Sequence, residues 1–140
     1  MSQENVEGVR RAFDALNRRE LDAFLALMDD DVEVVPRMSA IEGESGYRGH
    51  DGVRRWWNSL LDVFPDYGME VVEMQDLEDL TLATIHVRGH GAGSAAPTDH
   101  EAWIMVRWRH AKAVWWRTFD TRSEALEAVG LSEQDAHADS

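Results

Sequence analysis

The sequence predicts an α+β domain in which helices pack against one face of a mostly antiparallel sheet. Up to residue 67, most apolar side chains recur at the three- and four-residue spacing of amphipathic helices. Beyond residue 67 they recur at the two-residue spacing of strands. The chain has 140 residues, 44% of them apolar, which suffices for one domain with its own core. Helices that precede a run of strands are typical of α+β domains.

The first third of the chain is predicted to be mainly helical. The apolar stripe of the first helix consists of Val6, Val9, Phe13 and Leu16. A second short helix is expected over residues 21–28, ending at the acidic run 29–31. Residues 32–35 then alternate like a strand that Pro36 closes, and residues 37–50 read as a loop.

A third helix is predicted to begin near Asp51, a residue type that caps helices, and to end at Pro65. Four long strands follow over residues 69–74, 80–89, 100–109 and 113–119. Thr121 and Glu124 have the spacing of a capping box, so a last helix is expected over residues 124–129. We therefore predict a single domain over residues 1–131 and a polar, disordered tail over residues 132–140.

Both faces of the last two strands carry large apolar side chains. A sheet with one wet face should instead alternate apolar and polar residues. One set, which shares a face, consists of Trp103, Met105, Trp116 and Thr118. The other set consists of Ile104, Val106, Trp108, Trp115 and Phe119. Because the chain has few elements left to cover this second face, we predict a homodimer that buries it.

Charge and composition exclude several classes of partner. The net charge is 14 − 27 = −13, which repels nucleic acids and anionic lipid, so neither is expected as a partner. The longest apolar run is residues 23–28, too short to span a membrane. The absence of cysteine and of a signal-like N-terminus predicts a cytoplasmic protein.

Several segments, taken in order, resemble the SnoaL-like branch of the nuclear transport factor 2 superfamily. The segments are Phe13 together with residues 21–36, the run Tyr47-Arg48-Gly49-His50-Asp51-Gly52-Val53, and residues 64–66, 88–91 and 122–126. The resemblance implies a cone in which a strongly curved sheet wraps helices around an apolar pocket. It also implies that the pocket binds a small hydrophobic ring or polyketide-type molecule, and isomerises, cyclises or dehydrates it by metal-free acid/base chemistry. The alternative is a non-catalytic ligand-binding or dimerisation module of the same fold.

The sequence lacks the catalytic residues of two enzyme classes that have this fold, the ketosteroid isomerases and the limonene epoxide hydrolases. In ketosteroid isomerases one position carries the base carboxylate and two carry the hydrogen-bond donors; here these positions fall at Val35, at Ala12 or Phe13, and at Trp103. Val35 cannot act as a base, neither Ala12 nor Phe13 can donate a hydrogen bond, and Trp103 stands in place of the aspartic acid, so that mechanism is excluded. The arginine of limonene epoxide hydrolases has no counterpart in residues 99–103.

The resemblance also implies site residues. If Trp103 faces the pocket, the two-residue period adds Glu101, Met105 and Arg107, and Trp116 faces it from the last strand. Asp120 lies where SnoaL-type cyclases are understood to place an acid or base; alternatively it helps to cap the last helix. Arg107 holds an enolate or carboxylate, or else pairs with Glu101. The further lining residues are Phe13, Tyr47 and Trp57, with Trp56 in the core.

Three histidines lie in neighbouring strands. His86 and His90 share one strand face, and His100 is expected across the hairpin from His90. Three imidazoles together would suit zinc or nickel. Their parity places them with Ile104, away from the pocket, so we predict no metal and no cofactor.

Overall fold

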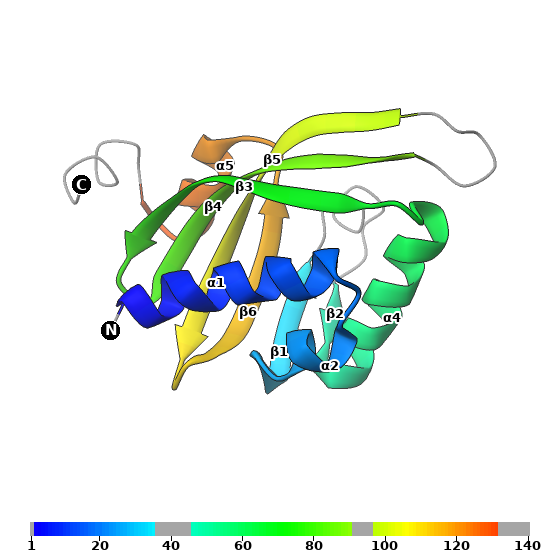
Figure 1. The fold of residues 1–140 in the computed structure, drawn as a ribbon. Coiled ribbons are helices and arrows are strands. Elements are labelled where there is room, and N and C mark those ends of the chain that lie inside the picture. Colours follow the sequence, from blue (N-terminus) through cyan, green and yellow to red (C-terminus); the bar gives the residue numbers. More distant parts are fainter. Residues whose placement is uncertain (1, 36–45, 91–96, 132–140) are drawn as a thin grey trace.

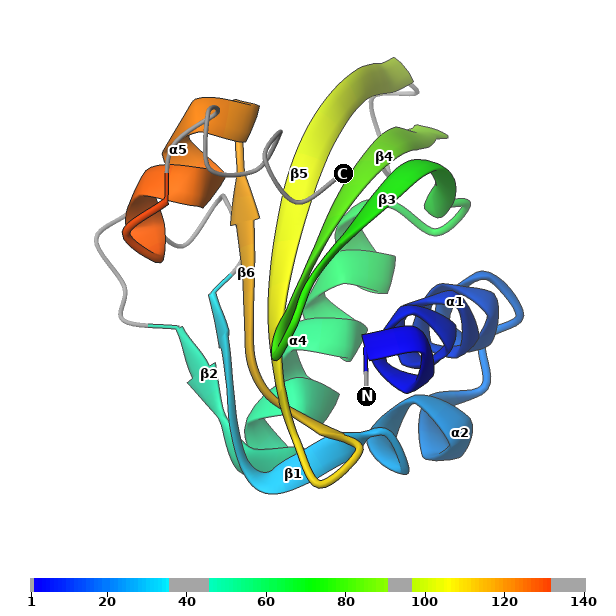
Figure 2. The ribbon, with the colours of Figure 1, turned by 90° about the vertical axis from the view of Figure 1, so that its left-hand side faces the viewer.

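A curved six-stranded sheet wraps around the N-terminal helices (Figures 1 and 2). The computed structural model describes residues 2–35, 46–90 and 97–131. The strand order is β2-β1-β6-β5-β4-β3, which leaves the sheet open with β2 and β3 at its edges. The strands are β1 (Met28–Val35), β2 (Tyr47–Arg48), β3 (Gly68–Leu77), β4 (Leu80–His90), β5 (Pro97–Arg109) and β6 (Lys112–Phe119). The predicted α+β cone is therefore confirmed, as an open sheet.

The helices lie close to where the apolar periodicity predicts them. They are α1 (Ser2–Asn17), α2 (Leu21–Leu25), α4 (Gly49–Val63) and α5 (Arg122–Ala128). One difference concerns the acidic run 29–31, which lies inside β1 and not at the end of a helix. The short strand β2, which pairs with β1, was not predicted. The predicted tail, residues 132–140, lies outside the described residues.

Helix α1 runs alongside the edge strand β3 and covers it. Near its start, Asn5 Nδ2 donates to the carbonyl of Glu78 at 3.1 Å. At its end, the Asn17 amide both donates to and accepts from the backbone of Met69. A helix laid over an edge strand protects the edge from pairing with other chains.

Aromatic side chains fill the space between the helices and the sheet. The Phe24 ring lies 5.3 Å from Trp57, 5.8 Å from Trp56 and 5.6 Å from Trp116, between ring centroids. Phe13 from α1 contacts Trp116 at 5.5 Å with its ring edge. All five rings are at most 6% exposed, so this cluster is the centre of the main core.

Helix α5 covers part of the opposite, outer face of the sheet. Ala125 and Leu126 pack there in a second cluster of buried side chains, together with Leu77, Leu80, Leu82 and Met105. The predicted capping box is confirmed, because Thr121 Oγ1 accepts from the Glu124 amide at 3.1 Å and donates to its carboxylate at 3.0 Å. Helix α5 therefore covers part of the outer sheet face that a partner subunit was expected to cover.

The predicted faces of β5 are reversed. Ile104 lies opposite Thr118 and Val106 opposite Trp116, and side chains directly opposite each other share a face. Ile104 and Val106 are fully buried in the main core, and Trp108 is buried there with 5% of its surface exposed. Of the five residues predicted to form an exposed dimer face, only Trp115 and Phe119 lie on the outer face, half-buried beside α5. The homodimer itself stays a prediction.

A β-bulge explains this reversal. Beside the turn at His110 and Ala111, Arg109 pairs with Lys112 and Trp108 with Ala113, but the next pair is Arg107 with Trp115. Val114 is therefore an extra residue in β6. Without this bulge the simple hairpin register would have put Trp103 and Met105 on the face of Trp116, as the sequence pattern predicted.

Candidate ligand groove

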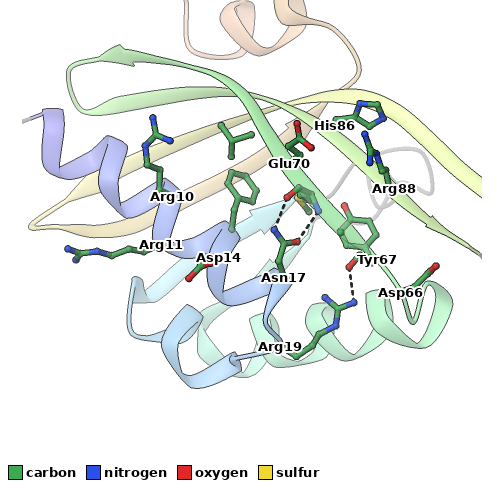
Figure 3. Close-up of a pocket in the computed structure, with 14 residues that line it drawn as sticks. Arg10, Arg11, Asp14, Asn17, Arg19, Asp66, Tyr67, Glu70, His86 and Arg88 are labelled. Carbon is green, nitrogen blue, oxygen red and sulfur yellow. Dashed lines mark hydrogen bonds between the residues drawn. The ribbon is translucent and has the colours of Figure 1, made fainter.

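An open groove of about 910 Å³ lies between α1 and strands β3 and β4 (Figure 3). Residues of α1 line one side, and the lining continues around the edge strand β3 to Glu70, His86 and Arg88 on the outer face of the sheet. The apolar part of the lining consists of Phe13, Tyr67, Met69 and Val71. The charged part consists of Arg10, Arg11, Asp14, Arg19, Asp66, Glu70, His86 and Arg88. A volume of this size accommodates a small organic molecule.

One end of the groove is held by hydrogen bonds from the end of α1. Arg19 adopts a left-handed backbone conformation, with φ 62°, directly after the helix. Its guanidinium donates to the carbonyls of Tyr67 at 2.7 Å and Pro65 at 3.1 Å. Together with the Asn17 pair to Met69, these bonds fix the start of β3 against α1.

The lining carries more positive than negative charge, in contrast to the whole chain. Four arginines and three carboxylates line it, a difference of +1, whereas the chain carries −13. Asp14 is already paired with Arg18 at 3.1 Å. Among the described residues, no ion pair is formed by Arg10, Arg11 or Arg88. Their guanidinium groups are exposed and available to a ligand.

A histidine–aspartate pair borders the groove. His86 on β4 forms a hydrogen bond through Nε2 with Asp99 Oδ1 on β5. This contact orients the imidazole, as carboxylates do for histidines that exchange protons. Arg88 is the next residue on the same face of β4 and lies opposite Asp99 in the sheet.

The predicted grouping of three histidines is wrong. Val87 lies opposite His100, whereas His86 lies opposite Glu101, so His86 and His100 are on different faces of the sheet. The side chain of His90 lies outside those that the structure describes. Across residues 2–35, 46–90 and 97–131, no three histidine, aspartate or glutamate side chains gather as a metal site. No helix within these ranges is long and apolar enough to cross a membrane.

Comparison with models of known protein families shows the family to which the chain belongs. The model of the SnoaL-like domain matches residues 9–121, most of the chain. The chain belongs to the SnoaL-like family. No curated protein was found to match this SnoaL-like protein.

Solved structures share the fold of this SnoaL-like protein at low sequence identity. TerC co-crystallized with polyporic acid superimposes with a TM-score of 0.75 at 16% identity, covering 84% of this chain and 92% of TerC. A ketosteroid isomerase-like protein from Catenulispora acidiphila, in complex with trimethylamine, gives 0.73 at 18% identity, covering 89% and 93%. A candidate SnoaL-like polyketide cyclase from Jannaschia gives 0.75 at 16% identity, covering 84% and 85%.

Three of the residues predicted to line an apolar pocket are core residues of the SnoaL-like domain. Phe13, Trp57 and Trp116 are each at most 4% exposed and contact other aromatic rings. Trp56 and Trp57 both contact Phe24, so the expected division into one core ring and one pocket ring is wrong. Phe13 is the one member of this group that also borders the α1–β3 groove.

Trp103 and Met105 do not share a cavity with Trp116. They lie on the outer face of β5 in the cluster covered by α5, whereas Trp116 lies on the inner face. The prediction of one cavity between Trp103 and Trp116 is therefore wrong, and its cause is the bulge at Val114.

The predicted polar and loop residues lie apart from the groove. Arg107 Nε is 3.8 Å from Asp79 Oδ2, so its ion pair is formed with Asp79 and not with the predicted Glu101. Glu101 is exposed on the outer face, opposite His86. Tyr47 lies in β2 with the guanidinium carbon of Arg55 5.8 Å from its ring centroid.

Asp120 is exposed and lies between the end of β6 and the helix cap Thr121. It is not among the residues that line the α1–β3 groove. Its proposed function as an acid or base stays a prediction.

The groove-lining arginines were missed because their sequence signal is that of an ordinary solvated helix face. Arg10, Arg11 and Asp14 lie opposite the apolar stripe of α1, which on its own indicates exposure to water. Only the packing of α1 along β3 brings this face beside Arg88, far away in the sequence. A periodic pattern carries no information about that neighbour.

Proposed function

We propose that this SnoaL-like protein binds a small ring-containing organic molecule in the groove between α1 and β3. The observation that carries the proposal is the groove's lining, in which Tyr67 and Val71 offer half-buried apolar surface beside convergent polar groups. Sites for small molecules typically combine apolar walls with a few polar groups that set orientation. The ring would lie against Tyr67 and Val71, with its polar substituents toward the charged rim.

Relatives of the same fold support binding of small organic molecules. TerC was crystallised with polyporic acid, and the Catenulispora protein with trimethylamine. The reactions that the family resemblance implies, isomerisation, cyclisation and dehydration, all move a proton. His86 borders the groove, and its imidazole, which the contact with Asp99 orients, is a group that can exchange a proton with a ligand. We therefore propose His86 as an acid/base group in addition to Asp120.

A non-catalytic binding protein is the second candidate function. The dense packing around Trp116 favours it, because Phe13 and Phe24 occupy the space beside this ring within the cone. A ligand held only in the open groove would stay in contact with water, and enzymes gain rate by excluding water from the reacting atoms.

Binding is tested with a matched pair of variants on β3. Val71 lines the groove, whereas the neighbouring Val72 is 56% exposed and does not line it. Isothermal titration with 2-naphthol should show binding to the native protein and to Val72→Tyr. It should show at least tenfold weaker binding to Val71→Tyr, because the added ring occupies the groove. Absence of binding to the native protein, or equal affinity of the two variants, would overturn the proposed site.

Proton transfer is tested separately with 2-tetralone, a ketone with exchangeable protons beside its carbonyl. If the protein is catalytic, it should accelerate deuterium incorporation in heavy water, followed by NMR, and His86→Gln should abolish the acceleration. An Asp120→Asn variant tests the alternative acid/base group in the same assay. A rate equal to that of buffer would favour the non-catalytic function.

A further inference from the structure

We propose that Arg19 is a positioning residue of the α1–β3 groove, and that it holds Tyr67 in the place that a bound ring needs. This inference rests on the proposed function, because Tyr67 is part of the wall against which the ring would lie. Arg19 and Tyr67 both line the groove, and the guanidinium group reaches the backbone of Tyr67 (Figure 3). Three observations support the inference: the backbone conformation of Arg19, the carbonyls that its side chain binds, and the contrast with other residues in the same conformation.

Arg19 occupies a position at the end of α1 where glycine is the favoured residue. The Arg19 N–H donates to the carbonyl of Leu16 at 3.2 Å, and the Glu20 N–H donates to the carbonyl of Ala15 at 2.8 Å. These two bonds form a Schellman motif, which ends a helix with one residue in the left-handed conformation. Arg19 is that residue, with φ 62°. Because a Cβ is strained in this conformation, the stability of the helix end alone would favour glycine.

The side chain of Arg19 makes contacts that glycine could not make. Its Nη1 donates to the carbonyl of Leu16 at 2.9 Å, and its Nη2 donates to the carbonyls of Tyr67 at 2.7 Å and Pro65 at 3.1 Å. Pro65 and Tyr67 belong to the connection between α4 and β3, 46 and 48 positions further along the chain. The guanidinium group thus joins the end of α1 to the segment that carries the Tyr67 ring. Hydrogen bonds from a charged donor are stronger than neutral ones, so they restrict where this segment lies.

The other left-handed residues that are not glycine lie in a different setting. In the described part of the chain they are Glu78, His110 and Ala111. All three belong to the two-residue connections of the hairpins β3–β4 and β5–β6, and such tight turns require a positive φ. None of the three lines the α1–β3 groove. Arg19 therefore combines a strained backbone with a groove-lining side chain, and strained residues of this kind cluster at binding sites.

The variant Arg19→Gly separates ligand binding from stability. Glycine keeps the left-handed backbone without its strain, but it cannot hold the carbonyl of Tyr67. The Tm should stay within about 3 °C of the native value, because relief of the strain offsets the loss of bonds from an exposed side chain. Isothermal titration should show at least tenfold weaker binding of 2-naphthol, because the groove is no longer held ready for the ring. In NMR spectra of the ligand-free protein, the Tyr67 ring signals should shift or broaden.

Ala111→Gly is the matched control, because Ala111 has nearly the same φ, 63°, and does not line the groove. This variant should keep the native affinity for 2-naphthol and the native Tyr67 signals. If Arg19→Gly binds 2-naphthol as tightly as the native protein does, or leaves the Tyr67 signals unchanged, the positioning role is refuted while ring binding stands. A Tm well below the stated range would make Arg19 a stabilising residue only and would also overturn the proposal. If the native protein does not bind 2-naphthol, the proposed function fails, and this role of Arg19 fails with it.

Discussion

Asn17, the last residue of α1, exchanges two hydrogen bonds with the backbone of Met69 at the edge of the sheet. Its Nδ2 donates to the Met69 carbonyl at 2.8 Å, and its Oδ1 accepts from the Met69 N–H at 3.0 Å. The side-chain amide thus pairs with β3 as a neighbouring strand would. This contact fixes the distance between the two walls of the groove at one end.

Replacing Asn17 by alanine should lower the free energy of unfolding by about 1–2 kcal/mol, because two backbone groups lose their partners. The Met69 amide should also exchange its hydrogen with solvent markedly faster, measured by NMR hydrogen exchange. Asn58→Ala, at an exposed position of α4, is the control and should change neither quantity. Unchanged Met69 exchange in Asn17→Ala would contradict the pairing.

Val106→Asp and Trp115→Asp should have different effects. Val106 is fully buried in the main core, so an unpaired carboxylate there should cost about 4 kcal/mol or more and leave the protein largely unfolded. Trp115 is half-buried on the outer face, and Trp115→Asp should stay folded. Circular dichroism measures folding, and sedimentation of native protein and Trp115→Asp tests the predicted homodimer. A folded Val106→Asp monomer would contradict the assigned face.

Gly8→Ala should destabilise the protein although alanine favours helices. A Cβ at Gly8 would lie 2.5 Å from Trp108 Cη2, and the Trp108 ring is held by a hydrogen bond from Nε1 to Thr81 Oγ1 at 3.2 Å. Overpacking costs about 1–3 kcal/mol, more than the gain of about 1 kcal/mol in helix propensity. Thermal unfolding should show a lower Tm. In a Trp108→Phe background the smaller ring leaves space, so there Gly8→Ala should become neutral or stabilising.

Glu33 makes stability depend on acidic pH. The hydrogen bond from Arg117 Nη2, at 2.9 Å, is the main cause that lowers the pKa of Glu33 below its ordinary value of 4.5; Arg48 adds to the shift, and partial burial opposes it. Because the folded-state pKa is depressed, the stabilisation is present above pH 4.5 and is lost as pH falls through the folded-state value. The free energy of unfolding should decline as the pH falls, and Glu33→Gln should remove the part of this decline that Glu33 causes. Urea unfolding between pH 3 and 6 measures the free energy of unfolding. Glu73→Gln, at an exposed site on β3, should leave the decline unchanged.

The helices, the four long strands and the fold class followed from the sequence because their signals are local. The spacing of Val9, Phe13 and Leu16 fixes one face of a helix regardless of what that face contacts. The capping box at Thr121 and Glu124 likewise needs only four consecutive residues.

The tertiary structure alone decided which side chains share a face and a groove. A single extra residue at Val114 shifts β5 by one position against β6, and a one-residue shift exchanges the two faces because the side-chain period of a strand is two. Trp103 therefore lies under α5, and Val106 lies in the core. Arg10 and Arg88 line one groove only because α1 packs along β3, and that contact depends on bonds between residues 52 positions apart, such as Asn17 and Met69.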